Sequence, residues 1–119
     1  MSDVPTKIWV LRRGNGKAEV NPSPAVLRYE ERFGIRNLTE RTVEVVFPPG
    51  TIISVPSKGI RARRIKGIRA RRIKTIPAGE IAVYRVVARG HQFFEYRVTL
   101  PAVQQYAEGG SKPGVIIDP

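Results

Sequence analysis

The chain has 119 residues, a length that suits a single domain with one hydrophobic core. It contains no cysteine, which excludes disulfides, thiolate metal sites and cysteine nucleophiles. Its formal charge is +11, from 21 Lys and Arg against 10 Asp and Glu, so negatively charged partners are favoured. The apolar run at residues 8–11 is too short for a signal peptide or a membrane span. We therefore expect no membrane span, and either a cytoplasmic protein or the mature part of an exported one.

Short apolar runs separated by proline and glycine predict β-strands from the N-terminus onward. The first expected strand covers residues 8–11, and residues 18–20 resume it after a turn. Two prolines make residues 21–24 a rigid connector, because proline fixes φ and removes a hydrogen-bond donor. We expect the strand that follows this connector to bury Leu27 and Tyr29.

Residues 33–49 carry a clear pair of strands. Apolar side chains alternate with other residues over 33–37 and again over 43–47, and the polar sequence between them turns the chain. This pattern predicts two adjacent, half-buried strands. Because two strands with one apolar face are not stable alone in water, the other apolar runs must supply the second layer of a sandwich.

The rest of the chain predicts further strands and no long helix. Residues 52–55 form a short apolar run, and residues 81–88 carry apolar side chains on both faces, as in a central strand. Residues 93–100 alternate with period two, residues 103–107 fit one helical turn, and residues 115–117 form a last strand. The sequence therefore predicts an all-β fold, a Greek-key β-sandwich of seven to eight strands.

Residues 59–74 read GIRARRIK twice, an exact tandem repeat with eight cations and no anion. The candidate anion- or nucleic-acid-binding residues are these cations, Arg61, Arg63, Arg64, Lys66, Arg69, Arg71, Arg72 and Lys74. Subtracting the eight charges from +11 leaves +3 for the rest of the chain, so the excess charge is concentrated in the repeat. At about 100° per residue the repeat forms no apolar helical stripe, whereas a basic hairpin fits if Arg63 and Arg64 form a bulge.

Two interpretations of the repeat remain open. A duplication tolerated as a solvated loop or hairpin needs no function, and removing one copy leaves a connection of more usual length. Alternatively, the repeat binds an anionic partner, nucleic acid first and then anionic protein, polysaccharide or lipid surfaces, because clustered cations release counterions from polyanions. No aromatic residue lies among these arginines, so the repeat itself does not indicate base stacking.

The order of the motifs outside the repeat resembles the strand succession of cupredoxins. These motifs are NPSP at 21–24, FGIRNLT at 33–39, VEVVFP at 43–48, PAG at 77–79, FEYRV at 94–98 and GVIID at 114–118. The resemblance implies a cupredoxin-like sandwich over most of the chain.

The copper ligands of the cupredoxin family are absent from this chain. The family binds blue copper through a histidine, a cysteine, a second histidine and often a methionine, and the resemblance puts the first histidine near Val43 and the cysteine near Val98. The chain has one histidine, His91, and one methionine, Met1. The resemblance therefore implies a metal-free sandwich without a cofactor, in which core side chains fill the metal pocket.

Catalysis finds little support in the sequence. His91 lies in a Gly-His-Gln turn, which is typical of a loop residue. Glu30 and Glu31 are adjacent, so on a strand they point to opposite faces and cannot work as an acid and base pair. The aromatic residues Trp9 and Phe93 are candidates for a binding patch, although a core role is the stronger expectation.

We therefore expect one non-enzymatic domain over residues 1–119, with a duplicated basic insertion at 59–74. Its leading specific function is electrostatic binding of an anionic partner through the repeat. The competing function class is a structural or assembly module that associates with another copy through a β-hairpin or a sheet edge, with the repeat a functionless duplication.

Overall fold

The computed structural model describes residues 4–12, 17–55, 73–100, 105–106 and 113–118, and every regular element in these ranges is a β-strand. The strands are β1 (Thr6–Arg12), β2 (Ala18–Asn21), β3 (Ala25–Leu27), β4 (Arg32–Asn37), β5 (Val43–Val46), β6 (Ile52–Val55), β7 (Ile73–Ile76), β8 (Ile81–Val86), β9 (Gln92–Glu95), β10 (Arg97–Leu100), β11 (Gln105–Tyr106) and β12 (Gly114–Ile117). The prediction of an all-β protein is confirmed for this part of the chain. The described residues of the chain include no helix long and apolar enough to cross a membrane.

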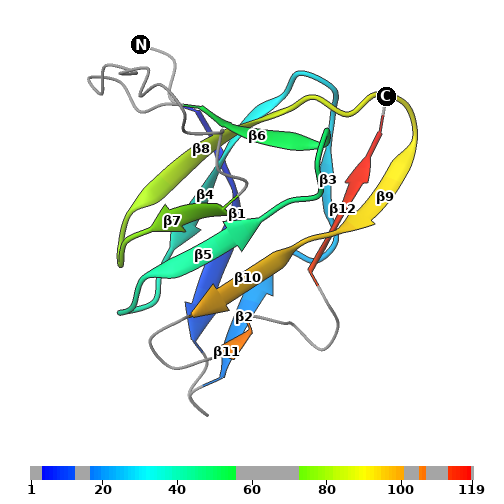
Figure 1. The fold of residues 1–119 in the computed structure, drawn as a ribbon. Coiled ribbons are helices and arrows are strands. Elements are labelled where there is room, and N and C mark those ends of the chain that lie inside the picture. The colour runs from blue at the N-terminus through cyan, green and yellow to red at the C-terminus, as the bar shows by residue number, and fades with distance from the viewer. Residues whose placement is uncertain (1–3, 13–16, 56–72, 101–104, 107–112, 119) are drawn as a thin grey trace, which may run out of the picture.

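The largest sheet has five strands in the order β2-β1-β4-β8-β6 (Figure 1). β1 forms a hairpin with β2 and runs parallel to β4, whereas β8 runs antiparallel to both β4 and β6. β8 is hydrogen-bonded on both sides, which confirms the central strand predicted for residues 81–88. Ala82, Tyr84 and Val86 alternate inward along β8 and are buried.

The two smaller sheets have the orders β11-β10-β5-β7 and β3-β12-β9. Only Tyr96 separates β9 from β10, so one chain segment belongs to both sheets, and Figure 1 shows β9 continuing into β10. Buried side chains from all three sheets form one hydrophobic core cluster, which gives a sandwich-like arrangement.

The strands β4 and β5 exist as predicted, but they do not pair with each other. β4 belongs to the five-stranded sheet and β5 to the four-stranded sheet, so the corner at residues 38–42 crosses between sheets. Alternation specifies which side chains are buried and not which strand is the neighbour. Phe33, Ile35, Val43 and Val45 are all buried, as the pattern predicts.

The side chain of Asn37 stabilises this corner from inside the protein. Its amide nitrogen donates hydrogen bonds to the carbonyl oxygens of Arg41 at 2.7 Å and Ile76 at 3.0 Å. Its amide oxygen accepts hydrogen bonds from the Thr39 backbone N–H at 2.9 Å and the Thr39 hydroxyl at 2.6 Å. Asn37 and Thr39 are both buried, so these bonds satisfy polar groups that water does not reach.

Three local predictions are wrong. Tyr29 is 38% exposed, because β3 ends at Leu27 and the chain then turns. Residues 93–100 do not form one strand, because the chain changes sheet at Tyr96. Gln105 and Tyr106 lie in a strand paired with β10, and not in a helical turn. The separate strand β2, the strands β7 and β11, which were not predicted, and the division at Tyr96 raise the number of strands above seven or eight.

Candidate functional site

Most of the basic repeat lies outside the described residues. Arg61, Arg63, Arg64, Lys66, Arg69, Arg71 and Arg72 all belong to the range 56–72, which the structure does not describe. Lys74, the eighth cation, lies in β7 and is half-buried opposite Val45 of β5. The two last residues of the second copy, Ile73 and Lys74, thus form the beginning of a strand.

The ends of the undescribed range belong to two different sheets. β6 ends at Val55 and is an edge strand of the five-stranded sheet, whereas β7 begins at Ile73 and is an edge strand of the four-stranded sheet. The basic segment therefore connects the edges of two sheets. Because edge strands lack a neighbour on one side, they are also the natural sites for pairing with another chain.

The positions that the cupredoxin resemblance assigns to copper ligands are filled by apolar core side chains. Val43 is fully buried, and Val98 is almost fully buried. His91 lies between β8 and β9 and is exposed. Among the described residues, no group of three or more His, Asp or Glu side chains could hold a metal ion.

Four aromatic rings form a cluster in the core. Tyr84 stacks with Phe33 at a centroid distance of 5.7 Å and meets the edge of Phe47 at 5.4 Å, and Phe47 stacks with Tyr96 at 4.6 Å. Burial raises the pKa of both tyrosines well above their ordinary value, and for Tyr84 the charge of Tyr96 raises it further. The raised pKa values keep both hydroxyls neutral in the folded protein at neutral pH, and neither hydroxyl donates a hydrogen bond to a described residue.

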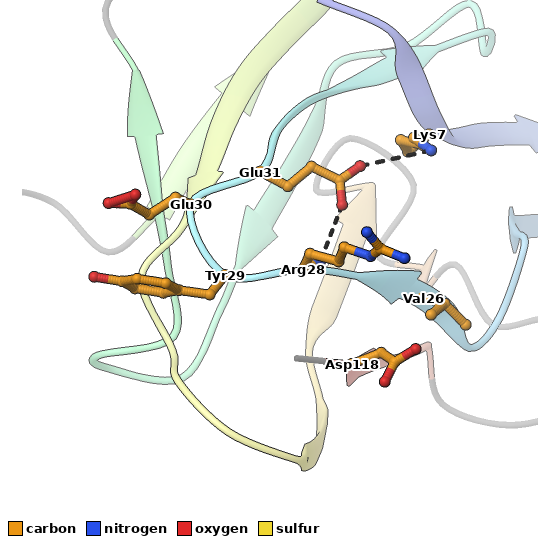
Figure 2. Close-up of a pocket in the computed structure, with 7 residues that line it drawn as sticks. All are labelled: Lys7, Val26, Arg28, Tyr29, Glu30, Glu31 and Asp118. Atoms are coloured by element: carbon orange, nitrogen blue, oxygen red, sulfur yellow. Dashed lines mark hydrogen bonds and ion pairs between the residues drawn. The ribbon is translucent and has the colours of Figure 1, made fainter.

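An open pocket of about 600 Å³ lies where β3 passes into β4 (Figure 2). The residues that line it are Lys7, Val26, Arg28, Tyr29, Glu30, Glu31 and Asp118. Sequence reasoning missed this pocket, because its residues come from both ends of the chain and no spacing signal connects Lys7 or Asp118 with Glu31.

Two charged groups of this pocket, Lys7 and Glu31, are used for local structure. One oxygen of Glu31 accepts a hydrogen bond from the Arg28 backbone N–H at 2.9 Å, and the other lies 3.5 Å from the Lys7 ammonium. Figure 2 shows Glu30 and Glu31 pointing in opposite directions. Glu30 adopts a positive φ of 67°. The two adjacent carboxylates therefore do not form a pair that could transfer a proton to and from one substrate atom.

The aromatic side chain of Tyr29 is held at one side of the pocket. The Arg89 guanidinium lies 4.7 Å above the centre of the Tyr29 ring and donates a hydrogen bond of 2.8 Å to its hydroxyl. These contacts explain how an aromatic residue that was predicted to be buried is stable at the surface.

Comparison with known proteins gives no family. No protein-family model matches the sequence, and no curated protein matches it either.

Proposed function

We propose that this protein is a non-enzymatic, metal-free β-sandwich that binds an anionic partner, nucleic acid first, through the basic repeat at residues 59–74. The observation that carries the proposal is the concentration of eight cations without an anion in that range. Such a cluster gains free energy from a polyanion by releasing its condensed counterions. The position of the segment in the chain supports the proposal, because the last described strand before it is β6 and its last two residues begin β7.

We also infer a Greek-key, cupredoxin-like topology for the sandwich. Two pairs of parallel strands support it, β1 with β4 and β3 with β12, since parallel neighbours require connections that cross from one layer to the other. The continuity of β9 and β10 supports it as well, because it joins the two smaller sheets into one layer in the order β3-β12-β9/β10-β5-β7.

The experiment is a titration of labelled single- and double-stranded oligonucleotides with the full chain and with a variant that lacks residues 67–74. Because the repeat is exact, the deletion leaves Ile65 and Lys66 in front of Thr75, so the sequence of β7 does not change. Removing four cations is expected to lower the log-log salt slope on duplex DNA by up to about 3.6, at about 0.9 per phosphate contact.

A second variant separates charge from length. R69Q/R71Q/R72Q/K74Q removes the same four charges and keeps all 119 residues. It is expected to bind as weakly as the deletion variant. If the full chain and both variants bind weakly and alike, the repeat is a tolerated duplication and the proposal is wrong.

The second candidate function is assembly through a sheet edge. β6 and β7 are edge strands, and a strand from another copy could extend either sheet. Light scattering on the full chain and on the deletion variant tests this function. A multimer that becomes a monomer on deletion would favour assembly, whereas a monomer in both samples would exclude it.

A further inference from the structure

The outer face of the five-stranded sheet carries arginines and no acidic residue on three neighbouring strands. The outward positions are Arg32, Gly34 and Arg36 on β4, Ile81, Val83 and Arg85 on β8, and Ile53 and Val55 on β6. Trp9 lies next to Arg36 on the neighbouring strand β1. We call Trp9, Arg32, Arg36, Ile53, Ile81 and Arg85 the arginine face.

Two of these arginines face each other directly. Arg32 of β4 and Arg85 of β8 are partners in the antiparallel ladder, which brings their Cβ atoms to about 5 Å. Like charges at such positions destabilise a sheet. Neither side chain forms an ion pair with another described residue. An anion bound between the two guanidinium groups would relieve this repulsion.

Apolar surface surrounds the arginines. Ile53 is 42% exposed beside Arg85, and Ile81 is 38% exposed beside Arg36. Ile81 lies flat on the sheet over Gly34, where an added Cβ would come within 2.5 Å of the Ile81 Cδ1 atom. Trp9 is half-buried, with its buried neighbours Ile8 and Val10 pointing into the core. The face is therefore partly apolar and positively charged.

We propose that the arginine face binds single-stranded nucleic acid, with phosphates on Arg32, Arg36 and Arg85 and with a base against Trp9. The class of partner rests on the proposed function, but the site is separate from the repeat. Charge complementarity favours a polyanion, since the outward positions of β4, β8 and β6 carry three cations and no anion. The apolar surface beside the cations favours a single strand, whose unpaired bases can stack on an aromatic ring or lie on aliphatic side chains.

Continuity with the basic repeat supports the same partner. Ile53 belongs to β6, and the chain leaves β6 after Val55 toward the repeat. A strand of nucleic acid that contacts Ile53 thus lies near the end of β6, from which the chain continues in sequence into the repeat.

Tryptophan fluorescence reports on this face directly, because Trp9 is the only tryptophan of the chain. The full chain is titrated with a short oligodeoxythymidylate at low and at moderate salt. We expect the oligonucleotide to quench Trp9 fluorescence in a saturable way. Anionic vesicles of phosphatidylserine and phosphatidylcholine serve as a second probe, and a Trp9 response to the vesicles alone would overturn the proposal in favour of a lipid surface.

A matched pair of variants tests the arginines. R32Q/R85Q removes two charges from the arginine face, and R41Q/R97Q removes two charges from exposed positions elsewhere. R32Q/R85Q is expected to weaken binding of the oligonucleotide about tenfold more than R41Q/R97Q does. It is also expected to lower the log-log salt slope of binding by about 1.4, at about 0.7 per phosphate of a single strand. Equal weakening by the two variants would overturn the proposal. Thermal unfolding of both variants verifies that each is folded.

The deletion of residues 67–74 separates the two proposals. If the deletion abolishes binding and R32Q/R85Q binds like R41Q/R97Q, the repeat binds nucleic acid and the arginine face does not. If R32Q/R85Q abolishes both binding and quenching while the deletion has no effect, the arginine face is the site and the proposed function of the repeat is wrong.

Discussion

Two single residues in the core, Tyr84 and Tyr96, combine large apolar rings with hydroxyl groups that have no described partner. Both rings contact Phe47, so they contribute to packing in the way that phenylalanine would. A buried polar group without a hydrogen bond costs free energy, since it has lost its bonds to water. We therefore expect the two hydroxyls to add nothing to the stability of the folded state at neutral pH.

The tyrosines predict a loss of stability in alkaline solution. The pKa of each is raised in the folded protein, so above about pH 10 the unfolded chain releases protons that the folded chain retains. The free energy of unfolding then falls by up to about 1.4 kcal/mol per pH unit for each tyrosine. In Y84F/Y96F this alkaline loss is expected to be much smaller, as measured by urea denaturation at several pH values.

The matched control is Tyr29→Phe, which removes a tyrosine from the surface and is expected to keep the alkaline loss. At neutral pH, Y84F/Y96F is expected to be as stable as the unsubstituted protein or more stable. A loss of more than about 1 kcal/mol at neutral pH would instead mean that the two hydroxyls have hydrogen-bond partners in solution.

Among the structural elements, the corner between β4 and β5 decides how the chain divides into layers. Asn37 fixes this corner by bonding to the corner itself and, through Ile76, to the end of β7. One side chain thus connects the five-stranded sheet to the four-stranded sheet. The corner also explains why the two strands, which follow each other in sequence, do not become neighbours.

We expect Asn37→Ala to destabilise the protein by more than about 2 kcal/mol, because each buried group left without a partner costs about 1–3 kcal/mol. Urea denaturation measures the loss. Leu38→Ala is the control in the same corner, since Leu38 is exposed and its truncation is expected to change stability by no more than about 0.5 kcal/mol. Equal effects of the two substitutions would contradict the structural role of Asn37.

The sequence predicts where strands lie better than it predicts their neighbours. The first strand at residues 8–11, the central strand at 81–88 and the last strand at 115–117 are all confirmed, because each carries a clear apolar pattern. The division at Tyr96 could not be predicted, since the alternation continues through it without a glycine or proline. Phe93 was expected in the core and is 61% exposed, because it lies on the opposite face of β9 from Phe94, which packs against the core.

The two candidate binding sites also differ in how far the sequence alone predicts them. Composition alone identifies the basic repeat, because eight cations in one segment need no knowledge of the fold. The arginine face requires the register of β4 and β8, since Arg32 and Arg85 are far apart in sequence and meet only in the ladder. Trp9 was expected in the core, and its position beside Arg36 depends on the parallel pairing of β1 with β4.

For the whole molecule, the dominant electrostatic fact is the formal charge of +11. Mutual repulsion among like charges destabilises a compact state, and the repeat contributes most of the excess. Dissolved salt screens charges that are separated by more than about 10 Å at 0.1 M. The stability of the protein and its affinity for polyanions should therefore respond to salt in opposite directions.

We expect the thermal unfolding midpoint to rise with sodium chloride concentration. The variant lacking residues 67–74 has a formal charge of +7, that is 11 minus 4, and its midpoint is expected to rise less. Calorimetry over a range of salt concentrations measures both effects. If salt raised the unfolding midpoints of the two proteins equally, the charge of the repeat would not destabilise the folded state.

The continuity of β9 and β10 couples the unfolding of the two smaller sheets. The backbone N–H of Tyr96 donates a hydrogen bond of 2.9 Å to the Pro113 carbonyl, just before β12, while its ring stacks on Phe47, just after β5. Separating either small sheet from the other must therefore break contacts of this one residue. The slowly exchanging amide protons of β12 and β5 should consequently be released together, as one cooperative unit, although the two strands belong to different sheets.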